Sequence, residues 1–242
     1  MSEEKKKKPL KERIGENIVQ FFSFSAIIVL VVFLSISQKT FLSPMNLSNL
    51  FRDTSTLIVL ASGMFMVLLF GSIDLSMGAA CSVSNVLYVK FLLTYGPKFI
   101  PAAAGVIGLL ISLMFGVVAG GLLGFIHVKL KVRDLLSGII MMTALYTVNL
   151  RIAGRANLPI YNKSTIFQND LVDKIIPKSL SSFKVVIIVL IITLISKYIL
   201  DWYLRTKSGM LLRAVGDNDH IITSLGVNKG KVKVVGLAIS NG

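Results

Sequence analysis

Charged residues are scarce in this sequence, and long stretches lack them altogether. Aspartate, glutamate, lysine and arginine together make up 16% of the 242 residues, whereas hydrophobic residues make up 54%. A soluble domain of this size could not bury so much apolar surface, so lipid must cover much of it. The scarcity of charge therefore excludes an ordinary soluble protein.

Cysteine is almost absent, and the common catalytic motifs are missing. The one cysteine, Cys81, allows no intrachain disulfide and is read as a small apolar residue of a membrane span. The sequence has no G-x-x-x-x-G-K-[ST] phosphate loop, no paired His/Cys metal spacing and no nucleophile–base constellation. We therefore expect no catalytic residue, no metal site and no cofactor on this chain.

Acidic residues are outnumbered by basic residues, 12 to 26, which gives a formal net charge of +14. The lysines and arginines gather at the ends of the apolar stretches, and they form no separate basic domain. This placement is typical of a solvated membrane face beside anionic lipid. We therefore expect contact with membrane lipid and no nucleic-acid partner.

Three uncharged runs predict the fold class. Asn17–Gln38, Thr54–Ile73 and Phe99–Ile126 contain 22, 20 and 28 residues without a charge. A helix needs about 20 mainly apolar residues to cross a bilayer. Backbone amides in lipid are satisfied only within helices or closed barrels, and these runs are too long and continuous for barrel strands. The sequence predicts an all-α, polytopic integral membrane protein.

About six complete transmembrane helices are expected, followed by a truncated seventh. The seventh apolar segment begins near Val234 and reaches Gly242, and its nine residues are too few to cross a bilayer. The chain therefore divides into a basic N-terminus, residues 1–15, and a transmembrane domain, residues 16–242, that is incomplete at its C-terminus. The six expected spans are, approximately, Ile18–Ser37, Thr54–Phe70, Leu75–Leu93, a part of Phe99–Ile126, Leu135–Leu150 and Val185–Tyr203.

The basic residues also orient the chain in the membrane. With the N-terminus inside the cell, the inner segments carry fifteen lysines and arginines and the outer segments carry nine. Positive charge is enriched on the cytoplasmic side of membrane proteins. We expect a multi-pass protein of the plasma or inner membrane with a cytoplasmic N-terminus. Arg151–Lys184 would then be extracytoplasmic, and residues 205–233 would be cytoplasmic.

Asp74 is a charged residue between two apolar runs, within the segment Gly71–Gly78. An isolated carboxylate at membrane depth is costly and usually faces a cavity or a partner. The glycines would let the backbone break here, with Asp74 or Ser76 capping the next helix. Two readings stay open, a helix cap at the membrane interface and a residue of a solute path.

Small residues mark one predicted span as a packing surface. Gly116 and Gly120 form a GxxxG pattern, and Gly121 and Gly124 follow. Such a stripe permits close contact between two helices in a membrane. We expect packing to be its role.

Glycines also punctuate the expected cytoplasmic segment. Gly216 and Gly226 bracket a predicted helix of nine residues, 217–225, with Asp217 or Asn218 at its N-cap. A short amphipathic helix between two spans either docks into a groove on a cytosolic partner or rests on the membrane interface. The apolar positions that would form its stripe are Ile221, Ile222, Leu225 and Val227.

Several motifs resemble the permease subunits of ATP-binding-cassette importers. Residues 46–50 (NLSNL) and 71–78 (GSIDLSMG) resemble the sugar permeases, although Ser72 replaces the second glycine that is usual in that turn. The middle of the chain is closer to permeases for aromatic amino acids. The motifs of that second type are residues 127–131 (HVKLK), 142–151 (MTALYTVNLR) and 154–160 (GRANLPI).

The cytoplasmic segment resembles both branches of this superfamily, which comprises ribose, galactoside and branched-chain amino-acid permeases. Residues 212–218 (LRAVGDN) and 225–228 (LGVN) match its coupling segment, and residues 238–242 (AISNG) match the start of the next family helix. The resemblance covers the chain from about Phe41 to its end. The residues that it assigns to coupling with the ATPase are Arg213, Gly216, Asp217, Asn218, Ile222, Leu225 and Gly226.

The resemblance implies a permease subunit that translocates a small polar organic solute by alternating access. Such a subunit holds no ATP, because two cytosolic ATP-binding subunits bind and hydrolyse it, so this chain is not expected to be an enzyme. The other implied partners are an extracytoplasmic solute-binding protein and a second permease subunit. The solute class (amino acid, simple sugar or nucleoside) and the type of dimer (homo- or heterodimer) stay open.

Polar residues inside the spans are the candidates for a translocation path, because burial in lipid otherwise costs energy. An interhelical hydrogen bond is the alternative reading for each of them. The alternative function is a membrane scaffold or an intramembrane enzyme without transport activity. An enzyme would need a catalytic pair within the spans, where the Asp, His and Cys residues show no partners in sequence. The candidate path residues are Asp74, Asn85, Thr143, Tyr146 and Asn149.

Overall fold

The structure is a computed structural model that describes residues 10–155, 158, 165, 167, 174–177, 183–224 and 226–242. Among these residues every regular element is a helix. Residues 1–9 of the basic N-terminus and most of the expected segment Arg151–Lys184 lie outside the described residues. The chain divides into two units, Met1–Leu50 and Phe51–Gly242, and each is described by itself.

The first unit contains helix α1 (Leu10–Ser37) and the first residues of α2 (Pro44–Leu69). The second span is expected to begin at about Thr54, but α2 already begins at Pro44, so the helix starts about ten residues earlier than predicted. Proline fits the first turn of a helix, where its missing N–H needs no partner. The Ser43 hydroxyl accepts a hydrogen bond from the Asn46 N–H at 3.3 Å, which is the bond of an N-cap residue.

The second unit continues α2 and contains most of the remaining helices. Five helices of the described chain are long and apolar enough to cross a membrane, and a shorter apolar stretch, Phe21–Ser37, lies at the expected first span. These findings confirm an all-α, multi-pass membrane protein. The elements after α2 are α3 (Met77–Thr94), the 3-10 turn η1 (Gly96–Lys98), α4 (Pro101–Lys129), α5 (Asp134–Ala153), α7 (Lys184–Arg205), α8 (Lys207–Asp217), α9 (Asp219–Ser224) and α10 (Lys229–Asn241).

Helix α3 is central to the second unit because it packs against both α4 and α5. Helix α10 packs against α4 and α8, and α7 packs against α8. The core that they share is formed by apolar side chains from α2, α3, α4, α5, α8 and α10. Its residues include Val67, Phe70, Val83, Leu123, Met141, Leu212 and Leu237.

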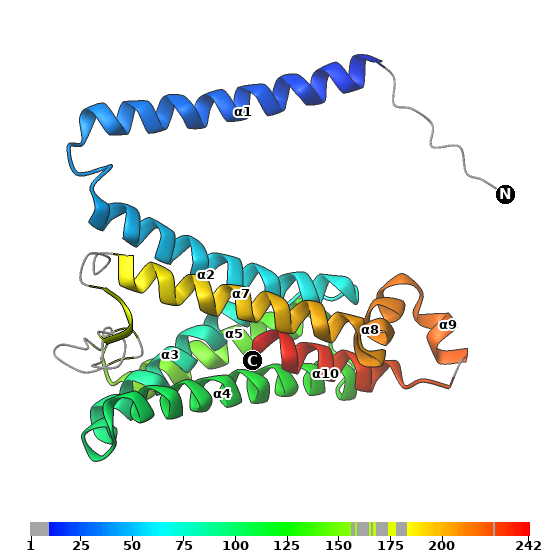
Figure 1. The fold of residues 1–242 in the computed structure, drawn as a ribbon. Coiled ribbons are helices and arrows are strands. Elements are labelled where there is room, and N and C mark those ends of the chain that lie inside the picture. Colours follow the sequence, from blue (N-terminus) through cyan, green and yellow to red (C-terminus); the bar gives the residue numbers. More distant parts are fainter. Residues whose placement is uncertain are drawn as a thin grey trace. The chain divides into compact units, whose positions relative to one another are not determined.

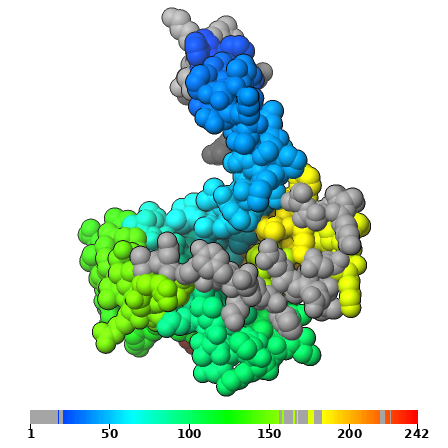
Figure 2. Space-filling model, turned by 90° about the vertical axis from the view of Figure 1, so that its left-hand side faces the viewer, coloured from blue at the N-terminus to red at the C-terminus, as the bar shows by residue number. Residues whose placement is uncertain are grey.

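The second unit has two different ends. Helices α8 and α9 lie at the end where α2 and α4 finish and α10 begins (Figure 1). The opposite end faces the viewer in Figure 2, where the green of α3–α5 and the yellow of the start of α7 form the surface. The short polar helices α8 and α9 thus lie together at one end of the bundle of long apolar helices.

The glycine stripe of α4 is a packing surface, as the sequence predicts, and the structure shows that α10 packs on it. A Cβ atom at Gly116 would collide with the Asn241 carbonyl oxygen, and one at Gly120 would collide with the Leu237 carbonyl oxygen. At Gly124 the nearest atom to such a Cβ would be the Cα of Val234, at 2.8 Å. Removing side chains from one helix face lets two backbones approach closely.

Candidate functional site

Helix α8 begins directly after α7. Thr206 stands at its N-cap in extended conformation, and its hydroxyl accepts a hydrogen bond from the Gly209 N–H at 3.3 Å. The buried residues Gly209, Leu212 and Val215 form one face of the helix. Arg213 and Asp217 are exposed. Helix α8 is therefore amphipathic, with one face on the bundle and one face open.

Helix α9 is shorter than the sequence predicts. Asn218 is extended (φ −159°, ψ 102°) and ends α8, so α9 runs over six residues, Asp219–Ser224, rather than over nine. Gly226 has φ +76°, its N–H donates to the Thr223 carbonyl at 3.0 Å, and the Val227 N–H donates to the Ile222 carbonyl at 3.2 Å. This pair of bonds is a Schellman motif, so Gly226 ends the helix as predicted.

Gly216 has a different role from the one predicted. It lies inside α8, so it does not mark the start of the next helix. A Cβ atom at this position would collide with the Leu69 carbonyl oxygen, at the C-terminal end of α2. Gly216 is thus required for the close approach of α8 to α2.

The predicted coupling residues fall into two groups. Arg213, Asp217, Asn218 and Gly226 are exposed at the end of the bundle. Ile222 is 4% exposed, so its side chain is covered almost completely within this chain. Leu225 lies outside the described residues.

Asp74 lies in the non-helical segment between α2 and α3 and is 0% exposed. One carboxylate oxygen, Oδ1, accepts hydrogen bonds from the backbone N–H and the hydroxyl of Ser76, both at 2.7 Å. The other oxygen, Oδ2, accepts from the side-chain amide of Asn241 on α10 at 2.7 Å. Ser76 occupies the N-cap position of α3 without a side-chain cap bond of its own. The carboxylate is therefore satisfied by neutral donors from two elements.

The other path candidates do not converge on Asp74. Asn149 of α5 donates to the hydroxyl of Ser82 on α3 at 2.9 Å, which is the interhelical bond of the alternative reading. The Thr143 hydroxyl donates to carbonyls of its own helix at 2.9 and 3.1 Å. Asn85 and Tyr146 are exposed on the surface of the chain. The structure thus joins Asn149 to α3 and leaves Asn85, Thr143 and Tyr146 at the periphery of this subunit.

A recess at the end of α4 contains a pair of residues that the sequence did not bring together. His127 Nδ1 lies 2.6 Å from Asp134 Oδ1 and 2.8 Å from the Val132 carbonyl oxygen. Both neighbours are acceptors, so Nδ1 carries the proton. The pair closes the loop between α4 and α5, and a spacing of seven residues across a predicted loop is the only signal that could have found it.

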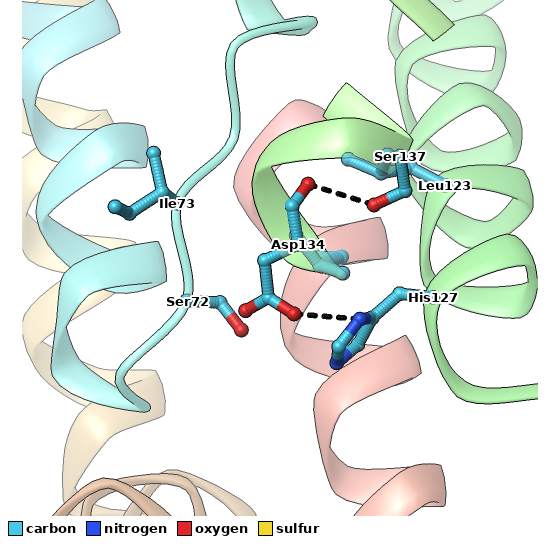
Figure 3. Close-up of a pocket in the computed structure, with 7 residues that line it drawn as sticks. Ser72, Ile73, Leu123, His127, Asp134 and Ser137 are labelled. Atoms are coloured by element: carbon cyan, nitrogen blue, oxygen red, sulfur yellow. Dashed lines mark hydrogen bonds and ion pairs between the residues drawn. The ribbon is translucent and has the colours of Figure 1, made fainter. Parts of the chain in front are cut away.

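The recess does not form a catalytic triad, although a serine lies in it. The buried hydroxyl of Ser72 has no hydrogen-bond partner, and Figure 3 shows it beside the Asp134 carboxylate, which lies between it and His127. A serine nucleophile needs the imidazole as its base, and the carboxylate on the far side of that imidazole. Among the described residues no cluster of three metal-ligating side chains occurs either.

The described helices form a bundle of long apolar helices with the short helices α8 and α9 at one end. The family described as the branched-chain amino acid transport system / permease component matches residues 46–241. The chain belongs to this family.

The relatives that match the chain are named for the transport of different solutes. A tyrosine transport system permease protein from Clostridioides difficile is 37% identical over 137 residues, which are 57% of this chain and 42% of the relative. Ribose import permease protein RbsC from Haemophilus influenzae is 26% identical over 231 residues, 94% of this chain and 67% of the relative. The D-allose transport system permease protein AlsC from Escherichia coli is 32% identical over 126 residues, 52% of this chain and 35% of the relative.

The matched stretches cover from 35 to 67% of the length of these three relatives. No solved structure matches the chain.

Proposed function

We propose that this chain is a transmembrane permease subunit of an ATP-binding-cassette importer for a small polar organic solute, an amino acid or a simple sugar. The observation that carries the proposal is the position of α8 and α9, in a chain of this permease family. They lie side by side at one end of the membrane bundle, with the charged face of α8 exposed.

The proposed mechanism is alternating access driven from the cytoplasm. Closure of the partner ATPase dimer on ATP would push α8 and α9 as a rigid body. Helix α8 lies against the end of α2 at Gly216, and its Leu212 lies against Gly236 of α10. A displacement of α8 therefore reaches two membrane helices directly.

The proposed partners follow from this mechanism. Cytosolic ATP-binding subunits supply the energy, an extracytoplasmic solute-binding protein delivers the solute, and a second permease subunit completes the translocation path. Asn85 and Tyr146 are exposed on this subunit, where a second copy or a related chain would line the path with them. ATP is bound by the partner subunit in this scheme.

The alternative of a scaffold or an intramembrane enzyme has less support. The Asp and His residues that looked isolated in sequence have structural partners, Asn241 for Asp74 and Asp134 for His127. Neither pair is arranged with an activated nucleophile.

A test of the function is ATP-driven uptake by the assembled transporter in proteoliposomes. The vesicles are oriented so that their lumen corresponds to the cytoplasm, and ATP is enclosed in the lumen. We expect this ATP to drive accumulation of tyrosine or of ribose in the lumen. Replacement of the phosphate-loop lysine of the ATPase should abolish the accumulation. An amine-bearing solute and a sugar are compared because relatives of both types match the chain. Solute movement that is independent of ATP would contradict the proposal.

The proposed orientation places the N-terminus and α8–α9 in the cytoplasm and η1 outside. In a Cys81→Ser background, we expect Lys98→Cys to react with a membrane-impermeant maleimide in intact cells. Lys207→Cys should react only after permeabilisation, because both lysines are exposed at opposite ends of the bundle. Labelling of both variants in permeabilised cells is the control, and the reverse pattern in intact cells would contradict the orientation.

A further inference from the structure

Asn241 lies in the motif of residues 238–242, to which the sequence assigns no contact, and in the structure it contacts a buried carboxylate. Its side-chain Nδ2 lies 2.7 Å from Asp74 Oδ2, across a separation of 167 residues. A carboxylate only accepts hydrogen bonds, so the NH₂ group of Asn241 must face it. The amide oxygen Oδ1 of Asn241 is buried without a partner. The same Nδ2 also donates to the Leu237 carbonyl of its own helix at 3.1 Å, so Asp74 and Leu237 together orient this side chain.

Asp74 connects two elements through its two oxygens. Oδ1 is held by the backbone and the hydroxyl of Ser76, at the start of α3, and Oδ2 is held by α10. All three donors are neutral, and the carboxylate is 0% exposed. A buried charge depends on its few hydrogen bonds, since water does not replace a lost one. The start of α3 is thus tied to α10 by a bond that is costly to break.

The same break between α2 and α3 is also held from its other side. Gly216 of α8 lies against Leu69 and Phe70, the residues that directly precede the break. Gly236 of α10 lies against Leu212 of α8 and against Phe70. Helices α8 and α10 therefore contact the segment 69–76 at both of its ends, by close packing at Phe70 and by the Asp74–Asn241 hydrogen bond.

We propose that Asn241 is a positioning residue that transmits movement of α8 and α9 to the start of α3 through Asp74. The proposal rests on the proposed permease function. When α8 moves, α10 moves with it, because the two helices pack at Gly236. Because the Asn241 amide is hydrogen-bonded to Asp74, the movement of α10 then displaces Asp74 and the non-helical segment before α3.

The chemistry of the pair provides a rescue experiment. Asn241→Asp places a second carboxylate against Asp74, and like charges at this distance repel. The double variant Asp74→Asn/Asn241→Asp again pairs one carboxylate with one amide, but the carboxylate is now at position 241 and the amide at position 74. Asp74→Asn alone should be milder than Asn241→Asp, because the Asn241 amide can turn and offer its oxygen to the new NH₂ group, with the loss of its bond to the Leu237 carbonyl. Asn241→Leu removes the donor without adding a charge.

The test measures solute uptake per ATP hydrolysed by the assembled transporter in proteoliposomes. We expect Asn241→Leu and Asn241→Asp to lower this ratio about 10-fold or more, which is the size of losing a hydrogen bond to a charged group. ATP hydrolysis itself should continue, because the ATPase is not altered. The double variant Asp74→Asn/Asn241→Asp should recover most of the ratio. Ser240→Ala is the matched control, since its hydroxyl bonds only the Leu237 carbonyl of its own helix at 3.0 Å.

A second readout uses the one cysteine of the chain. Cys81 is exposed on the first turns of α3, just after Asp74. We expect its rate of reaction with a maleimide to change with ATP in the wild type and in the double variant, and not in Asn241→Leu. A loss of folding alone would lower the protein yield, so the rates are compared at equal amounts of folded protein.

The inference is overturned if the wild type is active and Asn241→Leu has the same ratio of uptake to ATP hydrolysis. That result would leave the proposed function intact. A double variant that is no better than Asn241→Asp also overturns it. Absence of ATP-driven uptake by the wild-type assembly contradicts the proposed function and removes the inference with it.

Discussion

Alanine at Gly120 is expected to destabilise the chain, whereas alanine at the neighbouring Gly121 should not. The added Cβ at Gly120 would collide with the Leu237 carbonyl oxygen of α10, which is backbone and cannot turn away. At Gly121 the nearest atom to the new Cβ is the Cβ of Ala238, at 4.0 Å, an ordinary contact. Overpacking of this kind costs about 1–3 kcal/mol or more.

The comparison isolates the contact between α4 and α10, because both variants make the same chemical change, glycine to alanine, at neighbouring positions of one helix. Each replacement raises helix propensity by about 1 kcal/mol, so propensity cancels between them. The measurement is the midpoint of thermal unfolding in detergent, followed by far-ultraviolet circular dichroism. We expect a clear fall for Gly120→Ala and little change or a slight rise for Gly121→Ala. Equal midpoints would show that α10 does not lie on this stripe.

Charge reversal at Arg213 is expected to reduce ATP-driven uptake strongly without lowering the stability of the chain. Arg213 is exposed on α8, at the end of the bundle where the proposed ATPase binds. Reversing a charge that is desolvated at an interface costs about 2–5 kcal/mol of binding. Arg213→Glu should therefore reduce uptake by at least about 10-fold, since each 1.4 kcal/mol is tenfold.

Two further variants make this prediction specific. Lys98→Glu reverses an exposed charge on η1, at the opposite end of the bundle, and should leave uptake unchanged. Ile222→Asp should lower both uptake and thermal stability, because it places a carboxylate at a position that is 4% exposed. Full uptake by Arg213→Glu would exclude this face of α8 from the coupling contact.

The spans could be predicted from the sequence because the bilayer sets a length and excludes charge. The uncharged run Phe99–Ile126 begins two residues before the observed helix α4, Pro101–Lys129, and ends three residues before that helix ends. The predicted turn at Gly226 was also correct, since φ +76° is a conformation that glycine adopts without strain. Both predictions depend only on local chemistry.

The role of Gly216 could not be read from the sequence, because glycine has two uses. It ends helices, and it also lets backbones approach, and both uses leave the same residue in the sequence. Ile222 presents a similar ambiguity. An apolar residue on a short amphipathic helix packs equally well on its own chain or on a partner, and only the folded chain shows that it is buried.

The Asp74–Asn241 pair was missed because its two members are 167 residues apart. The local pattern around Asp74 shows only Ser76, which is why a cap was one of the readings. The structure retains that cap-like bond and adds the second one to α10. A contact of this kind depends on how α10 lies on the glycine stripe of α4, which no local pattern contains.

The central claim is that α8 and α9 bind a cytosolic ATPase, and copurification tests it most directly. The affinity-tagged chain is extracted from its native membrane, and bound proteins are identified by mass spectrometry. The account predicts an ATPase with a G-x-x-x-x-G-K-[ST] phosphate loop in stoichiometric amount with the wild type and with Lys98→Glu, and its loss with Arg213→Glu. An ATPase that is retained by Arg213→Glu and Ile222→Asp, or absent from the intact wild-type preparation, would contradict the account.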